Sequence, residues 1–154
     1  MSLARRFLVI QALLFWQGGF VFYAAVVVPT GSDVLGSFEQ GRVTRHVTDA
    51  MNVIGVVALF VLAWDQLANR DPVGCRRARW LLWGILAAGL VVLVVLHPRI
   101  ESYVDFAANG RVIDYPSFYL WHRVYLFVAT AQWVAGLGYV AVMLRAWSVG
   151  TRAA

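Results

Sequence analysis

The sequence contains few residues that could form covalent or metal cross-links. It has a single cysteine, Cys75, among 154 residues, which excludes an internal disulfide, a cysteine-based metal cluster and a CxxC redox pair. It has no lysine, so all 13 basic residues are arginine. It also lacks the motifs of a nucleophile elbow, a phosphate-binding loop or a histidine zinc site. Nothing in the sequence therefore argues strongly for an enzyme, although it does not exclude one.

Hydrophobic residues are abundant instead, at 61% of the chain, compared with roughly 45–50% in soluble domains. Four apolar stretches, each about as long as a bilayer core requires, use up most of the sequence: 7–28, 47–67, 80–97 and 117–144. Backbone groups in lipid must pair within their own segment, so these spans should be helices. We expect one domain, 1–154, with an all-α, up-down, four-helix transmembrane bundle.

Local signals suggest where these spans end. Pro29 and Gly31 should end the first span, and Pro98 disfavours helix geometry at the residue before it, which would end the third. Ser37 and Gln40 have the spacing of a capping box, which predicts a short outer amphipathic helix near 33–46 that could continue into the second span. The connection 98–116 should be partly structured. The first apolar run is about twice the usual length of a signal core, so we expect a retained helix.

The distribution of arginine predicts the orientation. One side of the predicted bundle carries eight arginines and two acidic residues, and the other carries five arginines and six acidic residues. Arginine excess marks the cytoplasmic side, so both termini and the 69–79 loop should be cytoplasmic, in the plasma (inner) membrane. Because the arginines flank the spans, they indicate orientation and no nucleic-acid partner. The expected partners are the lipid bilayer and either other membrane subunits or further copies in a homo-oligomer.

Four short patterns resemble those of one membrane protein family. They are Trp16-Gln17-Gly18, Pro29, Pro98-Arg99-Ile100-Glu101 and the segment from Phe118 to His122. In this order they resemble the four-helix integral membrane family that includes transmembrane protein 205, catalogued as a domain of unknown function. The resemblance covers about residues 7 to 144 and implies a small polytopic helical protein with no established reaction. Arg123 departs from the pattern, since a small residue is expected there.

Three histidines lie at the outer ends of the second, third and fourth spans: His46, His97 and His122. Because these ends are neighbours in an antiparallel bundle, the imidazoles could converge, with Asp49 and Glu101 as further ligands or as groups that orient them. Such a set suits zinc or copper, and two of the histidines could ligate the iron of haem b. The alternative interpretation is that the histidines are interfacial and bridge headgroups and water.

A polar stripe also leads from the outer end of the second span into the membrane. At 100° per residue its members fall within about 120° of one another: Arg42, Arg45, His46, Asp49 and Asn52. Charges facing lipid are costly, so the stripe should face the bundle interior, together with Arg123. It could form a path for an anionic substrate or a proton. It could instead be an ion-paired network, with Arg45 and Asp49 at i, i+4.

Two functional hypotheses remain open from the sequence. The first is a binding or transport module whose outward-facing pocket of histidine, carboxylate and arginine takes a metal ion, haem or a small polar ligand. The second is a structural or accessory subunit of a larger membrane complex, assembled through its small residues and aromatic belts. In both cases the amides Gln17, Asn52 and Gln132, which lie within spans, should hydrogen-bond neighbouring helices.

Overall fold

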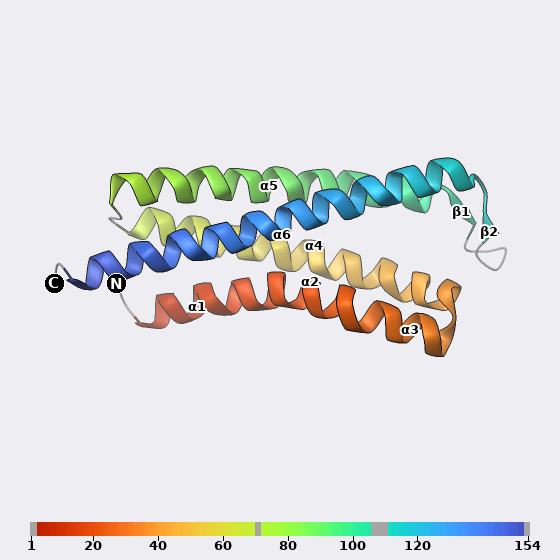
Figure 1. The fold of residues 1–154 in the computed structure, drawn as a ribbon, viewed down its shortest axis with the longest axis horizontal. Coiled ribbons are helices and arrows are strands. Elements are labelled where there is room, and N and C mark those ends of the chain that lie inside the picture. Colours follow the sequence, from red (N-terminus) through yellow and green to blue (C-terminus); the bar gives the residue numbers. More distant parts are fainter. Residues whose placement is uncertain (1–2, 70–71, 106–110, 153–154) are drawn as a thin grey trace.

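The structure is a computed structural model that describes residues 3–69, 72–105 and 111–152. Within these residues, four long helical segments run side by side with alternating direction (Figure 1). The first is a continuous run of α1 (Leu3–Leu13), η1 (Leu14–Gly18), α2 (Gly19–Phe22), η2 (Tyr23–Val27) and α3 (Val28–Leu35). The others are α4 (Ser37–Ala68), α5 (Val73–Glu101) and α6 (Tyr115–Arg152). The predicted all-α, up-down bundle is confirmed.

The connection between α5 and α6 is partly structured, as expected. It contains the short antiparallel strands β1 (Val104–Asp105) and β2 (Arg111–Val112), in which Val104 lies opposite Val112. We call the end of the bundle that holds these strands the outer end. The start of α1, the end of α6 and the junction of α4 with α5 lie together at the opposite end, which we call the inner end (Figure 1).

The first helical segment does not end at Pro29 or Gly31, so that expectation was wrong. It reaches Leu35, and the chain reverses at Gly36, whose φ of 84° favours glycine. Pro29 lies two residues after Val27, the last residue of the π-helical turn η2, and the Val28 N–H donates to the carbonyl of Tyr23, five residues back. This wider turn moves the backbone away from the regular α-helical spacing with which a proline ring clashes.

Pro98 does not end α5 either, since the helix continues to Glu101. A proline this close to the end of a 29-residue helix removes one hydrogen bond, and the Ser102 N–H still donates to the Pro98 carbonyl at 3.1 Å. The continuation places His97 and Glu101 one turn apart on the same side of α5. His97, the histidine of the third span, therefore lies within α5, one turn before Glu101.

The segment predicted as a short outer helix is not a separate element. Residues 37–46 form the first turns of α4, which is the continuation into the second span that the sequence allowed. The capping box does not form, because the helix is capped by Gly36 and no side chain bonds to the cap. The side chain of Gln40 instead turns towards the first helical segment and donates to the Tyr23 hydroxyl at 3.2 Å.

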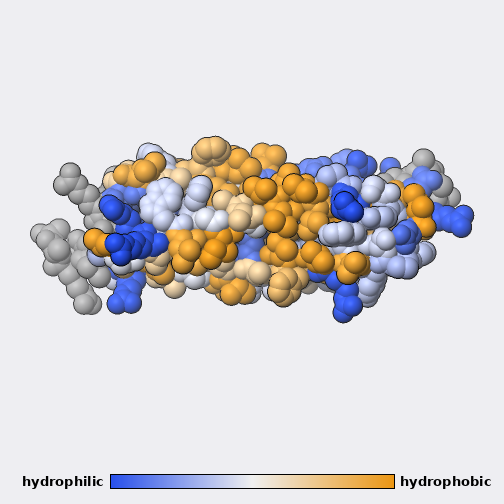
Figure 2. Space-filling model, turned by 90° about the horizontal axis from the view of Figure 1, so that it is seen from above, coloured by the Kyte–Doolittle hydropathy of each residue, from blue (hydrophilic) through white to orange (hydrophobic). Residues whose placement is uncertain are grey.

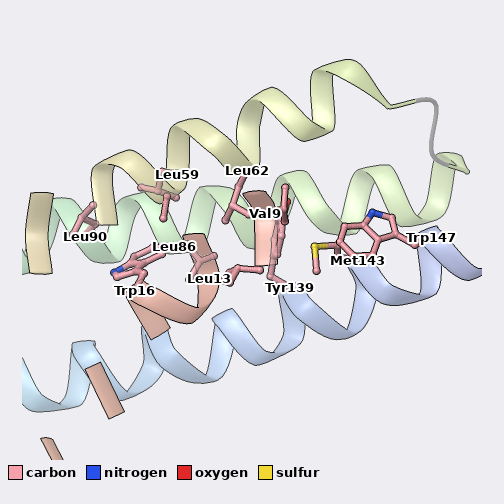
Figure 3. Packing of buried hydrophobic residues seen from close by; sticks show 11 residues of the cluster. Val9, Leu13, Trp16, Leu59, Leu62, Leu86, Leu90, Tyr139, Met143 and Trp147 are labelled. Carbon is pink, nitrogen blue, oxygen red and sulfur yellow. The ribbon is translucent and has the colours of Figure 1, made fainter. Parts of the chain in front are cut away.

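The core is a cluster of buried side chains contributed by all four helical segments (Figure 3). Trp16 packs against α4 at Gly55, where an added Cβ would lie 2.9 Å from the indole Nε1. Gln17 packs in the same way against Gly136 of α6, at 2.7 Å from its Oε1. The Trp16-Gln17 pair, which carried part of the family resemblance, thus fits into gaps that glycines leave in two other helices.

The face of the bundle shown in Figure 2 is mainly apolar along its middle and polar at both ends. Many large hydrophobic side chains of the protein are exposed, including Phe60 at 73% and Phe127 at 76%. A helix of 32 residues such as α4 is about 48 Å long, so its ends extend past a hydrocarbon core of about 30 Å. The chain is an integral membrane protein whose spans contact the lipid bilayer.

Candidate functional site

An ionic group joins α4 to α5 at the outer end of the bundle. The Arg45 Nε lies 2.7 Å from Glu101 Oε1, and His97 Nε2 lies 3.2 Å from the same carboxylate oxygen. His97 Nε2 also lies 3.3 Å from Asp49 Oδ1. His97 and Glu101 are mostly buried, at 15% and 19% side-chain exposure, whereas Asp49 is 62% exposed. The structure thus brings together Arg45, Asp49, His97 and Glu101 of the predicted site; we call them the outer ionic group.

The other two histidines lie elsewhere. His46 is exposed, and His122 is exposed and stacks on Phe118 with ring centroids 5.7 Å apart. Among the residues that the structure describes, no group of three or more His, Cys, Asp or Glu side chains could hold a metal ion. The three imidazoles are therefore not assembled into a zinc or copper site. His97 alone is packed between two helices.

The remaining charged residues of the predicted network are also at the surface. Arg42 is paired with Glu39 at 3.5 Å, one turn away on α4, and both are more than half exposed. Arg123 is exposed and lies over the ring of Tyr119, at 5.7 Å from its centroid. The expectation that the whole stripe faces the bundle interior was wrong. Arg42 and Arg123 lie in the outer turns of α4 and α6, where charged groups can reach headgroups and water.

The interior side of the outer turns of α4 is formed by uncharged polar residues. The Tyr23 hydroxyl donates to Thr44 Oγ1 at 2.9 Å, and Thr44 in turn donates to the Gln40 carbonyl at 2.8 Å. Gln40 is buried against Gly31, where any Cβ would overlap its amide group. Sequence reasoning missed this contact, although Gln40, Thr44 and Thr48 repeat at i, i+4 and so share one face of the helix.

A small internal cavity lies one turn deeper than the outer ionic group. Its volume is about 40 Å³, and its lining is mainly apolar, with polar side chains contributed by Gln17, Asn52, Tyr125 and Gln132. Asn52 follows Asp49 by three residues on α4, and the Tyr125 hydroxyl bonds to the Thr48 side chain. Of the predicted stripe, Asn52 is the member that reaches this interior space. A cavity of this size and polarity has room for a few water-sized groups.

The predicted role of the amides is borne out at Gln132. Its Nε2 donates to the Leu86 carbonyl of α5 at 2.8 Å, and its side chain packs against Gly89, where a Cβ would lie 3.2 Å from that nitrogen. The acceptor is a backbone oxygen of a neighbouring helix, as expected for an amide within a span. The same side chain forms one wall of the cavity.

A second ionic cluster lies at the inner end and is deeply buried. Arg79 lies 2.6 Å from Asp65 with neither side chain exposed, and the same guanidinium donates to the Tyr139 hydroxyl at 2.9 Å. The Arg5 Nε lies 3.2 Å from Asp65 Oδ1, and the side-chain amide of Asn69 donates to the same carboxylate oxygen at 2.9 Å. Sequence reasoning used these charges for orientation only. The signal that could have revealed the cluster is Asp65 itself, a carboxylate inside a predicted span that requires a partner.

The fold and these sites define a small polytopic membrane protein with ionic groups at both ends and, between them, a small cavity lined in part by amide side chains. In a comparison with known families, the family described as Domain of unknown function (DUF4149) matches residues 12–106. The match covers more than half of the chain, so the protein belongs to this family. The matched residues include Trp16, Asn52 and all four members of the outer ionic group. No curated protein and no solved structure matches the chain.

Proposed function

We propose that the protein is a membrane-embedded binding or transport module for a small polar ligand that enters from the outer end. The observation that carries this proposal is the internal cavity lined by Gln17, Asn52, Tyr125 and Gln132. Polar groups in the middle of a transmembrane bundle are costly and usually functional. Here four of them gather around space that no side chain fills.

The position of the cavity supports entry from the outer end. Asp49 and His97 lie one turn above it on α4 and α5, and Asp49 is the more exposed of the two. Towards the inner end, the bundle is filled by apolar side chains with no exposure, including Val9, Leu62 and Leu86 (Figure 3). The ligand would therefore bind on the outer side of this apolar block. Transport would require Leu62 and Leu86 to move apart.

The lining also supports the chemical class of the ligand. Amide groups and a phenol supply neutral hydrogen-bond donors and acceptors, and a cavity of about 40 Å³ is far smaller than a porphyrin. Metal or haem binding was an open hypothesis from the sequence. A small neutral or singly charged polar ligand fits the described residues better than a metal ion or haem does.

A structural or accessory role remains the second candidate because of the first helical segment. In the most apolar 18-residue stretch of this segment only 11% is buried, compared with 28% in the corresponding stretch of α6. Its exposed side includes Phe7, Leu14 and Phe22, each about 60% exposed. A partner helix, either from another membrane subunit or from a second copy of the chain, would fit this side. A stable complex of fixed stoichiometry after mild solubilisation would support this candidate.

The proposed function can be tested by screening small polar compounds for thermal stabilisation of the purified protein. A ligand that binds the native state raises its melting temperature. We expect compounds that stabilise the native chain to lose their effect on Gln132→Leu, which removes the cavity amide. Thr130→Val is the matched control on α6, because Thr130 is exposed and its hydroxyl bonds to the Leu126 carbonyl of its own helix. Equal stabilisation of all three proteins would contradict binding in the cavity.

We further propose the orientation and location that the sequence predicts, with both termini cytoplasmic and the protein in the plasma (inner) membrane. The clustering of arginine at the inner end supports this orientation. Within its family, a specific relationship to transmembrane protein 205 rests on the four short patterns given above and stays a proposal.

A further inference from the structure

A second space in the structure lies at the inner end, where α4 ends and α5 begins. It is a wide, open depression of about 480 Å³, lined by Gln66, Leu67, Asn69, Arg76, Arg77 and Trp80. This volume lies within the range typical of ligand sites. The depression is separate from the cavity of the proposed function, because the apolar core and the Asp65–Arg79 cluster lie between them.

One polar side chain in this depression lacks the partners that burial requires. Gln66 is only 3% exposed, yet neither its amide nitrogen nor its amide oxygen has a hydrogen-bond partner among the described residues. Leaving both polar atoms of a buried amide unpaired destabilises the folded protein. Since Gln66 lines the depression, a group bound there could satisfy it. The amide needs both an acceptor for its N–H groups and a donor for its oxygen.

The charges around the depression favour an anion. Arg76 and Arg77 are exposed in the first turns of α5 and make no ion pair within the part of the chain that the structure describes. The adjacent carboxylate of Asp65 is already paired with Arg79 and Arg5. The N-terminus of α5, a 29-residue helix, adds its partial positive charge at the same place.

We propose that this depression binds the headgroup of an anionic phospholipid that carries hydroxyl groups, such as phosphatidylglycerol. The phosphate would accept hydrogen bonds from Arg76, Arg77 and the Gln66 amide nitrogen, and a glycerol hydroxyl would donate to the Gln66 oxygen. Trp80 and the 77%-exposed Leu67 also line the depression, and the acyl chains would leave the site along these apolar side chains. Basic pockets beside transmembrane helices are an established type of site for anionic lipid headgroups.

The test uses native mass spectrometry of the full chain in neutral detergent, titrated with phosphatidylglycerol and, separately, with zwitterionic phosphatidylcholine. We expect the native protein to bind phosphatidylglycerol at least about tenfold more tightly, because both arginines attract the anionic headgroup. The double variant Arg76→Gln, Arg77→Gln should lose about that factor. Gln66→Leu should weaken phosphatidylglycerol binding by several-fold and phosphatidylcholine binding by less, because phosphatidylcholine has the phosphate but no headgroup hydroxyl to donate to the Gln66 oxygen.

Arg145→Gln is the matched control, because Arg145 is an exposed arginine near the inner end of α6 that does not line the depression. It should change binding less than about twofold. Equal binding of the two lipids by the native protein would overturn the proposal, and this comparison needs no variant to fold. So would an equal loss in the control and the double variant. Displacement of phosphatidylglycerol by millimolar inorganic phosphate would show a free-anion site and overturn the lipid assignment.

Discussion

The guanidinium of Arg79 lies 2.6 Å from the carboxylate of Asp65, and neither side chain has any exposed surface. This pair links α4 to α5, while Tyr139 from α6 and Arg5 from α1 each contact one of its members. All four helical segments therefore meet at one buried charge pair at the inner end. In an ion pair that is shielded from water in this way, each charge depends strongly on the other, because removing either partner leaves a buried charge without compensation.

This relationship predicts that two aspartate substitutions lower the free energy of unfolding by different amounts. Asp65→Leu should lower the free energy of unfolding by about 3–5 kcal/mol, because it leaves Arg79 buried without its carboxylate. Asp49→Leu should lower it by less than about 1 kcal/mol, because Asp49 is 62% exposed and its interaction with His97 is screened by solvent. Equilibrium unfolding in mixed detergent micelles measures both values.

A second substitution tests the explanation for Asp65. Adding Arg79→Leu to Asp65→Leu removes the uncompensated charge, so the double variant should be more stable than Asp65→Leu alone. If Asp49→Leu proves the more damaging of the two single changes, the ionic cluster at the inner end is not the one that holds the bundle together.

The contact between Trp16 and Gly55 predicts a further difference in stability. In Gly55→Ala the added methyl would lie 2.9 Å from the indole Nε1 and 3.2 Å from Leu90, so the helices must separate. We expect a loss of about 1–3 kcal/mol. Gly84→Ala is the control within a span, because no atom lies within 4 Å of its added Cβ. It should be neutral or slightly stabilising, since alanine favours helix. Equal effects would contradict close packing at Gly55.

The helices could be predicted from the sequence because membrane spanning depends on length and hydrophobicity, which are local properties. Their ends could not be predicted as well. Pro29 and Pro98 normally interrupt helices, but here one follows a π-helical turn and the other lies in the last turns of its helix. Both exceptions depend on hydrogen bonds that the residue types do not specify. The sequence therefore placed the ends of the first and third spans too early.

The candidate site was predictable only in part, for a different reason. The sequence placed His97, Glu101 and Asp49 near one another because they lie at the same end of neighbouring spans. It could not tell that His46 and His122 are directed to the surface, because the rotation of each helix about its axis depends on packing. Packing here is set by pairs such as Gln132 with Gly89 and Gln17 with Gly136, which are distant in sequence.

Orientation gives a prediction about the native cysteine. Cys75 is the third residue of α5 and lies at the inner end. The arginine excess assigns this side to the cytoplasm. A membrane-impermeant thiol reagent added to intact cells should leave Cys75 unlabelled, and labelling should appear once the membrane is permeabilised. A cysteine introduced at Tyr115, exposed at the outer end, is the control and should react in intact cells. The reverse pattern would invert the proposed topology.

The central proposal is that water and small polar molecules reach the cavity from the outer end, and two adjacent positions on α4 can test it. Asn52 lines the cavity, whereas Val53 is 64% exposed on the lipid-facing side at the same depth. Each is changed to cysteine in a Cys75→Ser background, and a small charged thiol reagent is added from outside. Such reagents need a hydrated thiol, because the thiolate is the reactive form. The account predicts modification of Asn52→Cys and none of Val53→Cys, whereas equal reaction of both, or reaction of Val53→Cys alone, would contradict it.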